Sequence, residues 1–358
     1  MGSILVSSSE QYSGKSSLCI GLAVILKNKG FSVGYMKPVG NLLVDVDGTL
    51  SDEDSEQALQ ILGLTDDRQY MTPVMLTENL IEDALHDEDG KLEDKILHSY
   101  SQIAEGKDAV VIEGSGGIGG GMMYNLSDPH VASLLDTRIL LITRYDSIQA
   151  VDRILCDIKL IPEPWMLAGV ILNEVEENDL KQVKELVVPF LKRKEIEVHG
   201  IIPKDRTLRS ITISEIVEDL HGDVLSGSEN LGELIDHYLV GAMEVNSAIK
   251  YFRRSPNSVV ITGGDRSDVQ MAAIEAGVKA LVLTGNLRPS EAVLGSADEA
   301  GVPIVLVRGD TMSTIERMEA LIGHTRIGQK TKLSRIVELV EDNVDIDSII
   351  SSMGLGEE

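Results

Sequence analysis

Short apolar segments alternate with segments of helical periodicity along this chain, and no other feature constrains the fold as strongly. Residues 3–7, 31–39, 108–115, 138–144, 167–173 and 197–203 have the composition of buried strands. Residues 15–29, 147–160 and 179–194 have helical periodicity. Apolar strands that are joined by helices form parallel sheets covered on both faces. The sequence therefore predicts an α/β fold with a doubly wound parallel sheet.

A polar stretch rich in Gly and Ser, residues 221–233, interrupts this pattern, and a shorter set of alternating strands and helices follows it. The 358 residues also exceed what one core usually holds. We therefore expect a first domain over residues 1–222 and a smaller α/β domain over residues 223–330. An amphipathic helix with an acidic tail is expected over residues 331–358.

The charge of the chain disfavours two classes of partner. A net charge of −26 repels nucleic acids and anionic membranes. The two cysteines form no CxxC pair, which disfavours a structural zinc site. Because no apolar run reaches ~18 residues and no signal peptide is recognisable, we expect a cytoplasmic protein.

The stretch "SSEQYSGKSS" lies between the first strand and the first helix, which is the context of a phosphate-binding loop. We expect the residues at the helix start to hold the phosphates of a nucleotide through unpaired N–H groups; they are Ser13, Gly14, Lys15, Ser16 and Ser17. Lys15 would reach the β- and γ-phosphates and the Ser16 hydroxyl would ligate Mg²⁺.

One position departs from the usual G-x-x-x-x-G-K-[ST] pattern, because Ser9 stands where the first glycine is expected. A serine accepts this turn if its φ is negative, whereas a positive φ would count against binding. The alternative interpretation is a serine-rich turn that holds no ligand.

Two further charged residues end strands that should lie beside this loop. Lys37 ends the second strand, where it could meet an anionic ligand. Glu113 ends an apolar strand and precedes a glycine-rich stretch, which places a carboxylate near the Mg²⁺ position. The alternatives are a solvated lysine and a surface carboxylate.

Together these residues resemble the dethiobiotin synthetase family, whose loop reads Thr-Gly-Thr-Asp-x-x-x-Gly-Lys-Thr. Lys15, Ser16, Lys37 and Glu113 match the family pattern, while Ser8 stands in place of its first glycine. The resemblance implies that Asp54, with Asp52 as the alternative, joins Ser16 and Glu113 as a Mg²⁺ ligand. It also implies that Asn173 and Pro203 contact adenine.

The whole chain resembles the dethiobiotin-synthetase-like N-terminal part of long bacterial phosphotransacetylases, in which a DRTGG domain follows the P-loop domain. The segments "YLVGAMEVNSAIKYF" and "VVITGGDRSDVQMAAIEAGVKALVLTGN" carry this resemblance. It implies a link to acetyl-CoA and acetyl phosphate metabolism and a homo-oligomer. Because the phosphotransacetylase catalytic domain is not recognisable, we do not expect the chain to make acetyl phosphate by itself.

Two turns of the second domain follow apolar strands and could form a small-ligand cleft. In the first, Asp265 could cap the next helix and leave Arg266 free for an anion. The alternative is an Asp265–Arg266 ion pair that fixes the turn or a subunit interface. The residues of this effector or interface site are Thr262, Gly263, Gly264, Asp265, Arg266, Thr284 and Gly285.

Three functions remain open. As an enzyme, the chain would bind ATP and Mg²⁺, and Lys15 and Lys37 would stabilise the transferring γ-phosphoryl group during activation of a small carboxylate or carbamate. A ligase of the dethiobiotin synthetase type is the special case. As a regulatory protein, it would bind nucleotide and a small effector or partner with little turnover. As a scaffold, it would carry a degenerate phosphate loop and an effector-binding DRTGG domain.

Overall fold

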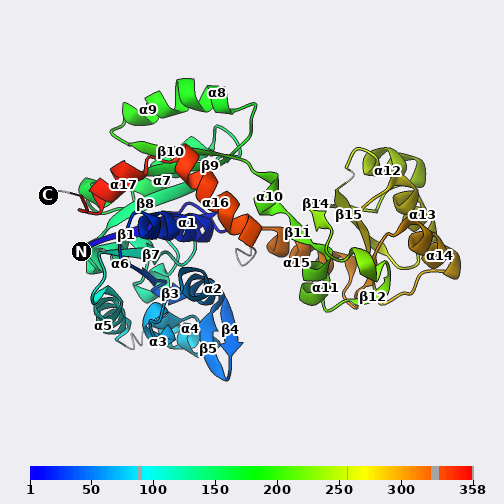
Figure 1. Ribbon diagram of the computed structural model, residues 1–358, viewed down its shortest axis with the longest axis horizontal. Coiled ribbons are helices and arrows are strands. Elements are labelled where there is room, and N and C mark those ends of the chain that lie inside the picture. The colour runs from blue at the N-terminus through cyan, green and yellow to red at the C-terminus, as the bar shows by residue number, and fades with distance from the viewer. Residues whose placement is uncertain (87–90, 256, 324–329, 357–358) are drawn as a thin grey trace. The chain divides into compact units, whose positions relative to one another are not determined.

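The computed structural model describes residues 1–86, 91–255, 257–323 and 330–356. The chain forms two compact units (Figure 1). Unit 1 comprises Met1–Asp205 and Arg326–Glu358, and unit 2 comprises Arg206–Thr325. Unit 1 is built around a parallel sheet and unit 2 around a mainly parallel one, so the predicted α/β class is confirmed.

Unit 1 contains a six-stranded parallel sheet. Its order is β10 (Val198–Pro203), β9 (Leu167–Val175), β8 (Arg138–Arg144), β1 (Gly2–Ser8), β7 (Ala109–Glu113) and β2 (Val33–Met36). The central strand β1 pairs with β7 on one side and β8 on the other, with Val6 opposite Glu113. Because the side chains of β7 and most of those of β8 are buried, the sheet forms the core of this unit.

Helices surround this sheet. They are α1 (Lys15–Asn28), α2 (Glu53–Leu62), α3 (Arg68–Met71), α4 (Glu78–Leu85), α5 (Leu92–Ala104), α6 (Asp128–Leu134), α7 (Ala150–Ile158), α8 (Leu180–Gln182), α9 (Val188–Lys192), α16 (Lys330–Asn343) and α17 (Ile346–Ser352). A π-helical turn, Val183–Val187, joins α8 to α9. The helix α16 packs on α1, where Gly21 lies against Ile336 and Val340.

Two small sheets extend unit 1 beyond β2. The strands β3 (Val39–Gly40) and β6 (Val74–Met75) pair in parallel, and β4 (Leu43–Val46) and β5 (Thr49–Asp52) form a hairpin. The β3–β6 pair brings the residues that follow Lys37 beside those that follow α3.

Unit 2 contains a five-stranded sheet. Its order is β12 (Asp223–Ser226), β17 (Ile304–Leu306), β16 (Ala280–Thr284), β15 (Ser258–Gly263) and β14 (His237–Val240), in which only β12 is antiparallel to its neighbour. The helices are α10 (Arg206–Arg209), α11 (Ile213–Leu220), α12 (Val245–Phe252), α13 (Ser267–Ala276), α14 (Glu291–Ala300) and α15 (Thr311–Gly323). A short pair, β11 (Ile211–Thr212) with β13 (Leu234–Ile235), completes the unit.

The division between the units differs from the expected division at residues 221–233. That stretch contains β12, which pairs with β17 inside unit 2. Before it, Ile213, Ile216 and Leu220 of α11 are buried against the sheet of the same unit. These apolar residues at helical spacing draw the segment after Asp205 into unit 2. The expected tail, residues 331–358, groups with unit 1, and its last two residues lie outside the described part.

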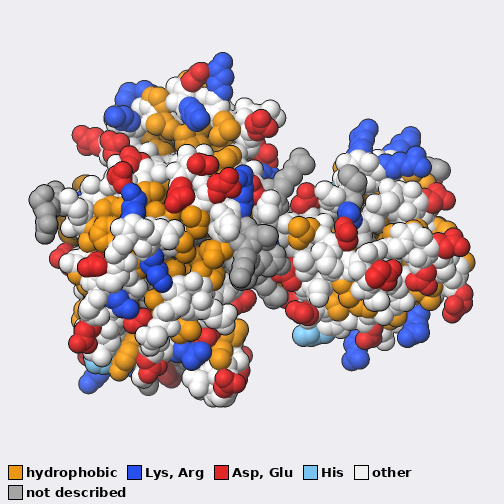
Figure 2. Space-filling model, viewed as in Figure 1, with side chains coloured by type: hydrophobic (Ala, Val, Ile, Leu, Met, Phe, Trp, Pro, Cys, Tyr) orange, Lys and Arg blue, Asp and Glu red, His pale blue; other side chains and the backbone are white. Residues whose placement is uncertain are grey.

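The surface reflects the acidic composition of the chain. Acidic side chains are scattered over both units in Figure 2 and form no single patch in this view. Among the residues that the structure describes, no helix is both long enough and apolar enough to span a bilayer.

Candidate functional site

The loop between β1 and α1 has the backbone geometry that its sequence suggests. Gly14 has φ +90°, and a Cβ atom at this position would lie 2.3 Å from Asn173 Nδ2. That amide nitrogen donates a hydrogen bond of 2.8 Å to Ser13 O. Only glycine fits here, because a side chain would meet both an unfavourable φ and the end of β9.

The two serines near the first glycine position of the consensus hold the loop to neighbouring segments. Neither Ser8 nor Ser9 has a positive φ. Ser8 Oγ donates to Glu10 O at 2.9 Å and to Gly116 O at 2.5 Å, and Ser9 Oγ lies 2.7 Å from Thr143 Oγ1. Both serines therefore have the negative φ that the turn of a phosphate-binding loop requires of a serine.

The start of α1 brings Lys15 and Ser16 under this loop. Lys15 Nζ donates to Gly116 O at 3.3 Å, and Ser16 Oγ donates to Glu113 Oε1 at 2.7 Å. The first N–H groups of a helix lack helical acceptors and, with the helix dipole, favour an anion at this end. A basic side chain, a hydroxyl and the N–H groups of a helix start thus lie together at this point.

Glu113 is a buried carboxyl group of the site with a perturbed pKa. It is 1% exposed and also accepts a 2.7 Å hydrogen bond from Tyr35 OH through Oε2. Burial and the nearby Asp54 carboxylate raise the pKa of Glu113 to about 7, against the opposing charges of Lys37 and Lys15. A buried carboxyl with a raised pKa loses its excess proton readily when a cation arrives.

Lys37 is held by two carboxylates. Its Nζ donates to Asp52 Oδ1 at 2.9 Å, to Asp52 Oδ2 at 3.1 Å and to Asp54 Oδ2 at 2.5 Å. Burial lowers the pKa of this ammonium, but Asp54 and Asp52 outweigh that effect and keep the pKa above its usual range. Asp52 also caps α2 by accepting from the backbone N–H of Asp54 and Ser55.

The oxygen ligands near the loop fit Mg²⁺ that is shared with a nucleotide. The described residues contain no group of three or more His, Cys, Asp or Glu side chains arranged for a metal ion. Mg²⁺ usually takes one or two carboxylates and completes its shell with phosphates and water. Ser16 and Glu113, with Asp54 close enough to raise the pKa of Glu113, meet that requirement.

Two residues predicted to contact adenine lie at neighbouring strand ends. Asn173 lies in β9 and Pro203 ends β10, where it pairs in register with Val175. The amide of Asn173 is bonded to the loop at Ser13 O, so it fixes the loop whatever else it contacts. Contact of either residue with adenine stays a prediction.

Several residues around the loop escaped the sequence analysis. Asp128, at the start of α6, is buried and accepts a 2.5 Å hydrogen bond from Ser7 Oγ. Burial raises the pKa of Asp128 to about 6, against the Ser7 hydrogen bond. On the opposite side, Glu10 Oε1 lies 3.3 Å from Arg144 Nε and 4.0 Å from Arg153. The only sequence feature that could have pointed to these residues is that each lies next to the loop or close to the end of a strand.

In unit 2 the two predicted turns lie side by side, because Gly263 of β15 is opposite Thr284 of β16. Gly264 leaves no room for a side chain, since its Cβ would lie 1.7 Å from Leu287 O. This pairing brings together the predicted site residues Thr262, Gly263, Gly264, Asp265, Arg266, Thr284 and Gly285.

The expected roles of Asp265 and Arg266 need correction. Helix α13 begins at Ser267, so its N-cap is Arg266, and no side chain caps it. The ion pair of Arg266 is with Asp268, at 3.3 Å from Nε to Oδ1. Asp268, in the first turn of α13, supplies the carboxylate that pairs with Arg266. Asp265 therefore neither caps the helix nor forms the expected ion pair with Arg266.

Comparison with known proteins gives two family matches. A model described as an AAA domain matches residues 2–212, and the DRTGG domain model matches residues 215–321. The phosphate acetyltransferase of Synechocystis sp. is 25% identical over 98% of this chain and 51% of its own length. That of Nitratidesulfovibrio vulgaris is 23% identical over 98% of this chain and 51% of its own length.

The chain therefore spans about half the length of the curated relatives it matches. A solved structure of the CBS and DRTGG domains of Clostridium perfringens pyrophosphatase, complexed with its activator diadenosine tetraphosphate, aligns with 44% of this chain and 73% of that chain. The identity is 18% and the TM-score 0.29. The predicted relation to the N-terminal part of phosphotransacetylases is confirmed. The chain belongs to the AAA domain family and carries a DRTGG domain after it.

Proposed function

We propose that this chain binds ATP with Mg²⁺ at the phosphate loop of unit 1 and acts as a nucleotide-responsive regulatory module in acetyl-CoA and acetyl phosphate metabolism. One observation carries the proposal. The Ser16 hydroxyl at the start of α1 is hydrogen-bonded to the buried carboxyl of Glu113, directly under a loop whose glycine has φ +90°.

Each group has a task in nucleotide binding. The N–H groups at the start of α1 would donate to the phosphates, and the Lys15 ammonium, which now donates to Gly116 O, would donate to the β- and γ-phosphate oxygens instead. Ser16, Glu113 and Asp54 would hold Mg²⁺. Bound there, the ion would neutralise phosphate charge and remove the proton that Glu113 otherwise retains near pH 7.

The state of Lys37 favours regulation over phosphoryl transfer. A lysine that stabilises a transferring γ-phosphoryl needs donors directed at it. Lys37 is 1% exposed and donates to three carboxylate oxygens of Asp52 and Asp54. ATP-dependent activation of a small carboxylate or carbamate, as in a ligase of the dethiobiotin synthetase type, is the second candidate. It requires the Lys37 ammonium to turn from both Asp52 and Asp54 towards the γ-phosphoryl group, whereas Mg²⁺ binding engages Asp54 alone.

Unit 2 supplies the regulatory half of the proposal as an effector-binding or homo-oligomer-forming unit. Gln270 is fully buried beside the paired turns and donates to Gly263 O at 2.9 Å. Its Oε1 has no hydrogen-bond partner within the described part of the chain. Such an acceptor is costly unless a donor reaches it. A small effector with an N–H or O–H group would satisfy it.

One pair of assays tests the proposal and separates its two forms. Binding of a fluorescent N-methylanthraniloyl ATP is measured with Mg²⁺ and with EDTA, and ADP release is followed with a panel of small carboxylates. Mg²⁺-dependent binding with slow, carboxylate-independent ADP release supports the regulatory form. ADP release stimulated by a carboxylate supports the ligase form instead. Absence of saturable binding at millimolar nucleotide overturns both and leaves the scaffold interpretation.

A further inference from the structure

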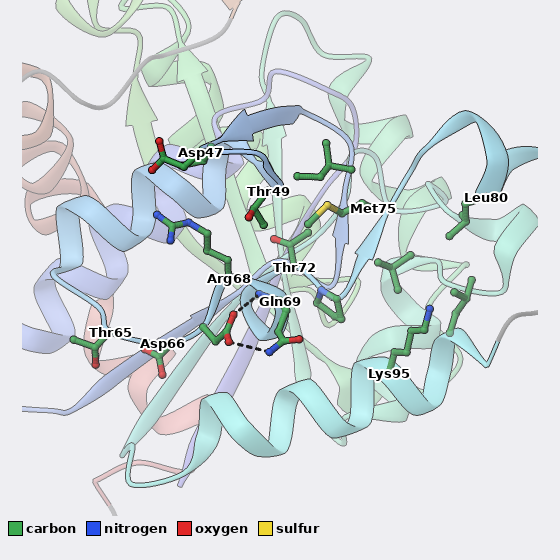
Figure 3. A pocket seen from close by; sticks show the side chains of 16 residues that line it. Asp47, Thr49, Thr65, Asp66, Arg68, Gln69, Thr72, Met75, Leu80 and Lys95 are labelled. Carbon is green, nitrogen blue, oxygen red and sulfur yellow. Dashed lines mark hydrogen bonds between the residues drawn. The ribbon is translucent and has the colours of Figure 1, made fainter.

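A cavity of about 930 Å³ lies in unit 1, away from the phosphate loop. The β4–β5 hairpin, the segment from Thr65 to Met75 and the helices α4 and α5 surround it (Figure 3). Its volume is within the range of small-molecule sites in proteins. None of the residues that we assign to nucleotide or Mg²⁺ binding lines it, so the cavity is separate from the nucleotide site.

One side of the cavity is acidic. Arg68 is held by Glu56 through two hydrogen bonds, 2.6 Å from Nε to Oε1 and 3.1 Å from Nη2 to Oε2. The hydrogen bonds and charge of Glu56, followed by the charges of Asp47 and Asp67, raise the pKa of Arg68. Asp47, Asp66 and Asp67 line this side together with Arg68, whereas Glu56 does not line the cavity. Because Asp66 pairs with Lys107 at 3.4 Å and Arg68 pairs with Glu56, the charges of Asp47 and Asp67 leave this side net negative, which suits a cationic group.

The opposite side carries a cation. Lys95 of α5 lines the cavity, and Figure 3 shows it on the other side from Asp47 and Arg68. The structure gives its ammonium no hydrogen-bond or ion-pair partner among the residues that it describes. The lining also includes apolar side chains, namely Val74, Met75, Leu80 and Leu92. A ligand that fits has an anionic end at Lys95 and an apolar middle.

We propose that this cavity is a binding site for a small ω-amino carboxylate, a molecule whose amino group and carboxylate are separated by a short apolar chain. The amino group lies beside Asp47 and Asp67, and the carboxylate pairs with Lys95. A purely anionic ligand is disfavoured by the acidic side, and a purely cationic one gains nothing from Lys95.

The wall of the cavity is joined to the nucleotide site by a chain of hydrogen bonds. Thr72 lines the cavity, and its Oγ1 lies 2.6 Å from Ser55 Oγ. The backbone N–H of Ser55 donates to Asp52 Oδ1 at 3.4 Å, and the same oxygen accepts from Lys37 at 2.9 Å. In addition, Lys37 N donates to Met71 O at 2.8 Å. An occupant that shifts α3 therefore shifts the Lys37 cluster.

The coupling between the cavity and the Lys37 cluster affects function only if the proposed nucleotide site exists. Binding of a ligand to the cavity does not depend on that site. Displacement of the Asp52–Lys37 contact changes the charges that face Asp54 and Glu113. The ligand and MgATP therefore change each other's affinity by the same factor, as linkage requires. The cavity would then report the level of a small metabolite to the nucleotide site.

The binding test uses 6-aminohexanoate, with hexanoate and hexylamine as probes that each lack one charged end. Ligand-observed NMR titration of the nucleotide-free full chain should show saturable millimolar binding of 6-aminohexanoate, at least threefold tighter than either control. Lys95→Gln should remove the advantage over hexylamine, and Asp47→Asn should reduce the advantage over hexanoate. Thr49→Trp, an exposed lining position that tolerates a larger side chain, should block binding of all three.

Equal binding of the three probes, no saturable binding at tens of millimolar, or binding unchanged by Lys95→Gln and Thr49→Trp in folded protein overturns the site. Circular dichroism establishes that each variant is folded. A second titration measures MgATP affinity with and without saturating 6-aminohexanoate. A change of threefold or more supports the coupling, and an unchanged affinity refutes it while the cavity site stands. If MgATP does not bind at all, the proposed function fails, and the NMR titration still shows whether the cavity binds 6-aminohexanoate.

Discussion

The buried carboxyl of Glu113 should weaken the folded protein when no metal is bound. Its pKa is raised from an ordinary 4.5 to about 7, first by burial and then by Asp54. One pKa unit corresponds to about 1.4 kcal/mol, so ionised Glu113 costs on the order of 3 kcal/mol of unit 1 stability above pH 7. We expect Glu113→Gln to recover much of this. The amide keeps the shape, accepts from Tyr35 OH and donates to the Ser16 hydroxyl.

The sign of the pH dependence follows from proton binding. Below pH 4.5 both the folded and unfolded states carry the proton, so the charge makes no difference. Between pH 4.5 and 7 only the folded state retains it, and stability falls by up to about 1.4 kcal/mol per pH unit. The free energy of unfolding of Glu113→Gln should therefore exceed that of the wild type by an amount that grows from pH 4.5 to 7 and is constant above pH 7.

The single tryptophan makes this measurement specific for unit 1. Trp165 lies in a short 3-10 helix of that unit, Pro164–Met166, so its fluorescence reports unfolding there. Urea titrations in EDTA from pH 4 to 8 give the free energy of unfolding of each protein. Asp128→Asn is the matched control, because the pKa of Asp128 rises only from 3.8 to about 6 and its window lies lower. The reasoning would be refuted if the difference in free energy of unfolding between Glu113→Gln and the wild type did not vary with pH. It would also be refuted if Glu113→Gln were less stable than the wild type at pH 8.

Three further outcomes are expected. Gly14→Ala should lose at least about 1 kcal/mol of stability and most nucleotide affinity, because φ is +90° and the added Cβ meets Asn173; thermal unfolding and ATP titration check this. Lys37→Met should destabilise unit 1 by about 3–5 kcal/mol, since Asp52 and Asp54 lose their buried cation; urea unfolding with Lys181→Met as the exposed control checks it. The apparent Mg²⁺ affinity of the ATP-bound protein should fall by up to about tenfold per pH unit below 7 as protons compete for Glu113, and a pH-independent affinity would contradict this.

The phosphate loop and its nearest partners could be predicted because their signals are local. A strand, a glycine-containing turn and a helix start follow one another within residues 2–28, and strand ends of a parallel sheet meet at one edge. That geometry alone brings Glu113 to Ser16. The same rule placed Lys37 near the loop, but it could not show that Asp52 and Asp54 hold its ammonium.

The rest depends on contacts between distant residues. Asp128 meets Ser7 across 121 positions, and neither residue lies in a motif. The large cavity is built from a hairpin and two-residue strands, whose pairing is too short to leave a periodic signal. The sequence predicts that the second domain begins at residue 223, whereas unit 2 begins at Arg206. The polar, glycine-rich stretch at 221–233 resembles a linker, although β12 within it completes a sheet.

The central claim is that MgATP binds at the phosphate loop, and calorimetric titration of the wild type and Lys15→Ala tests it most directly. Lys181→Ala, an exposed lysine of α8 in the same unit, is the control for the loss of one charge. We predict saturable MgATP binding by the wild type and Lys181→Ala and loss of at least tenfold in affinity for Lys15→Ala. Absence of binding by the wild type at millimolar nucleotide, or equal affinity of all three proteins, would contradict the account.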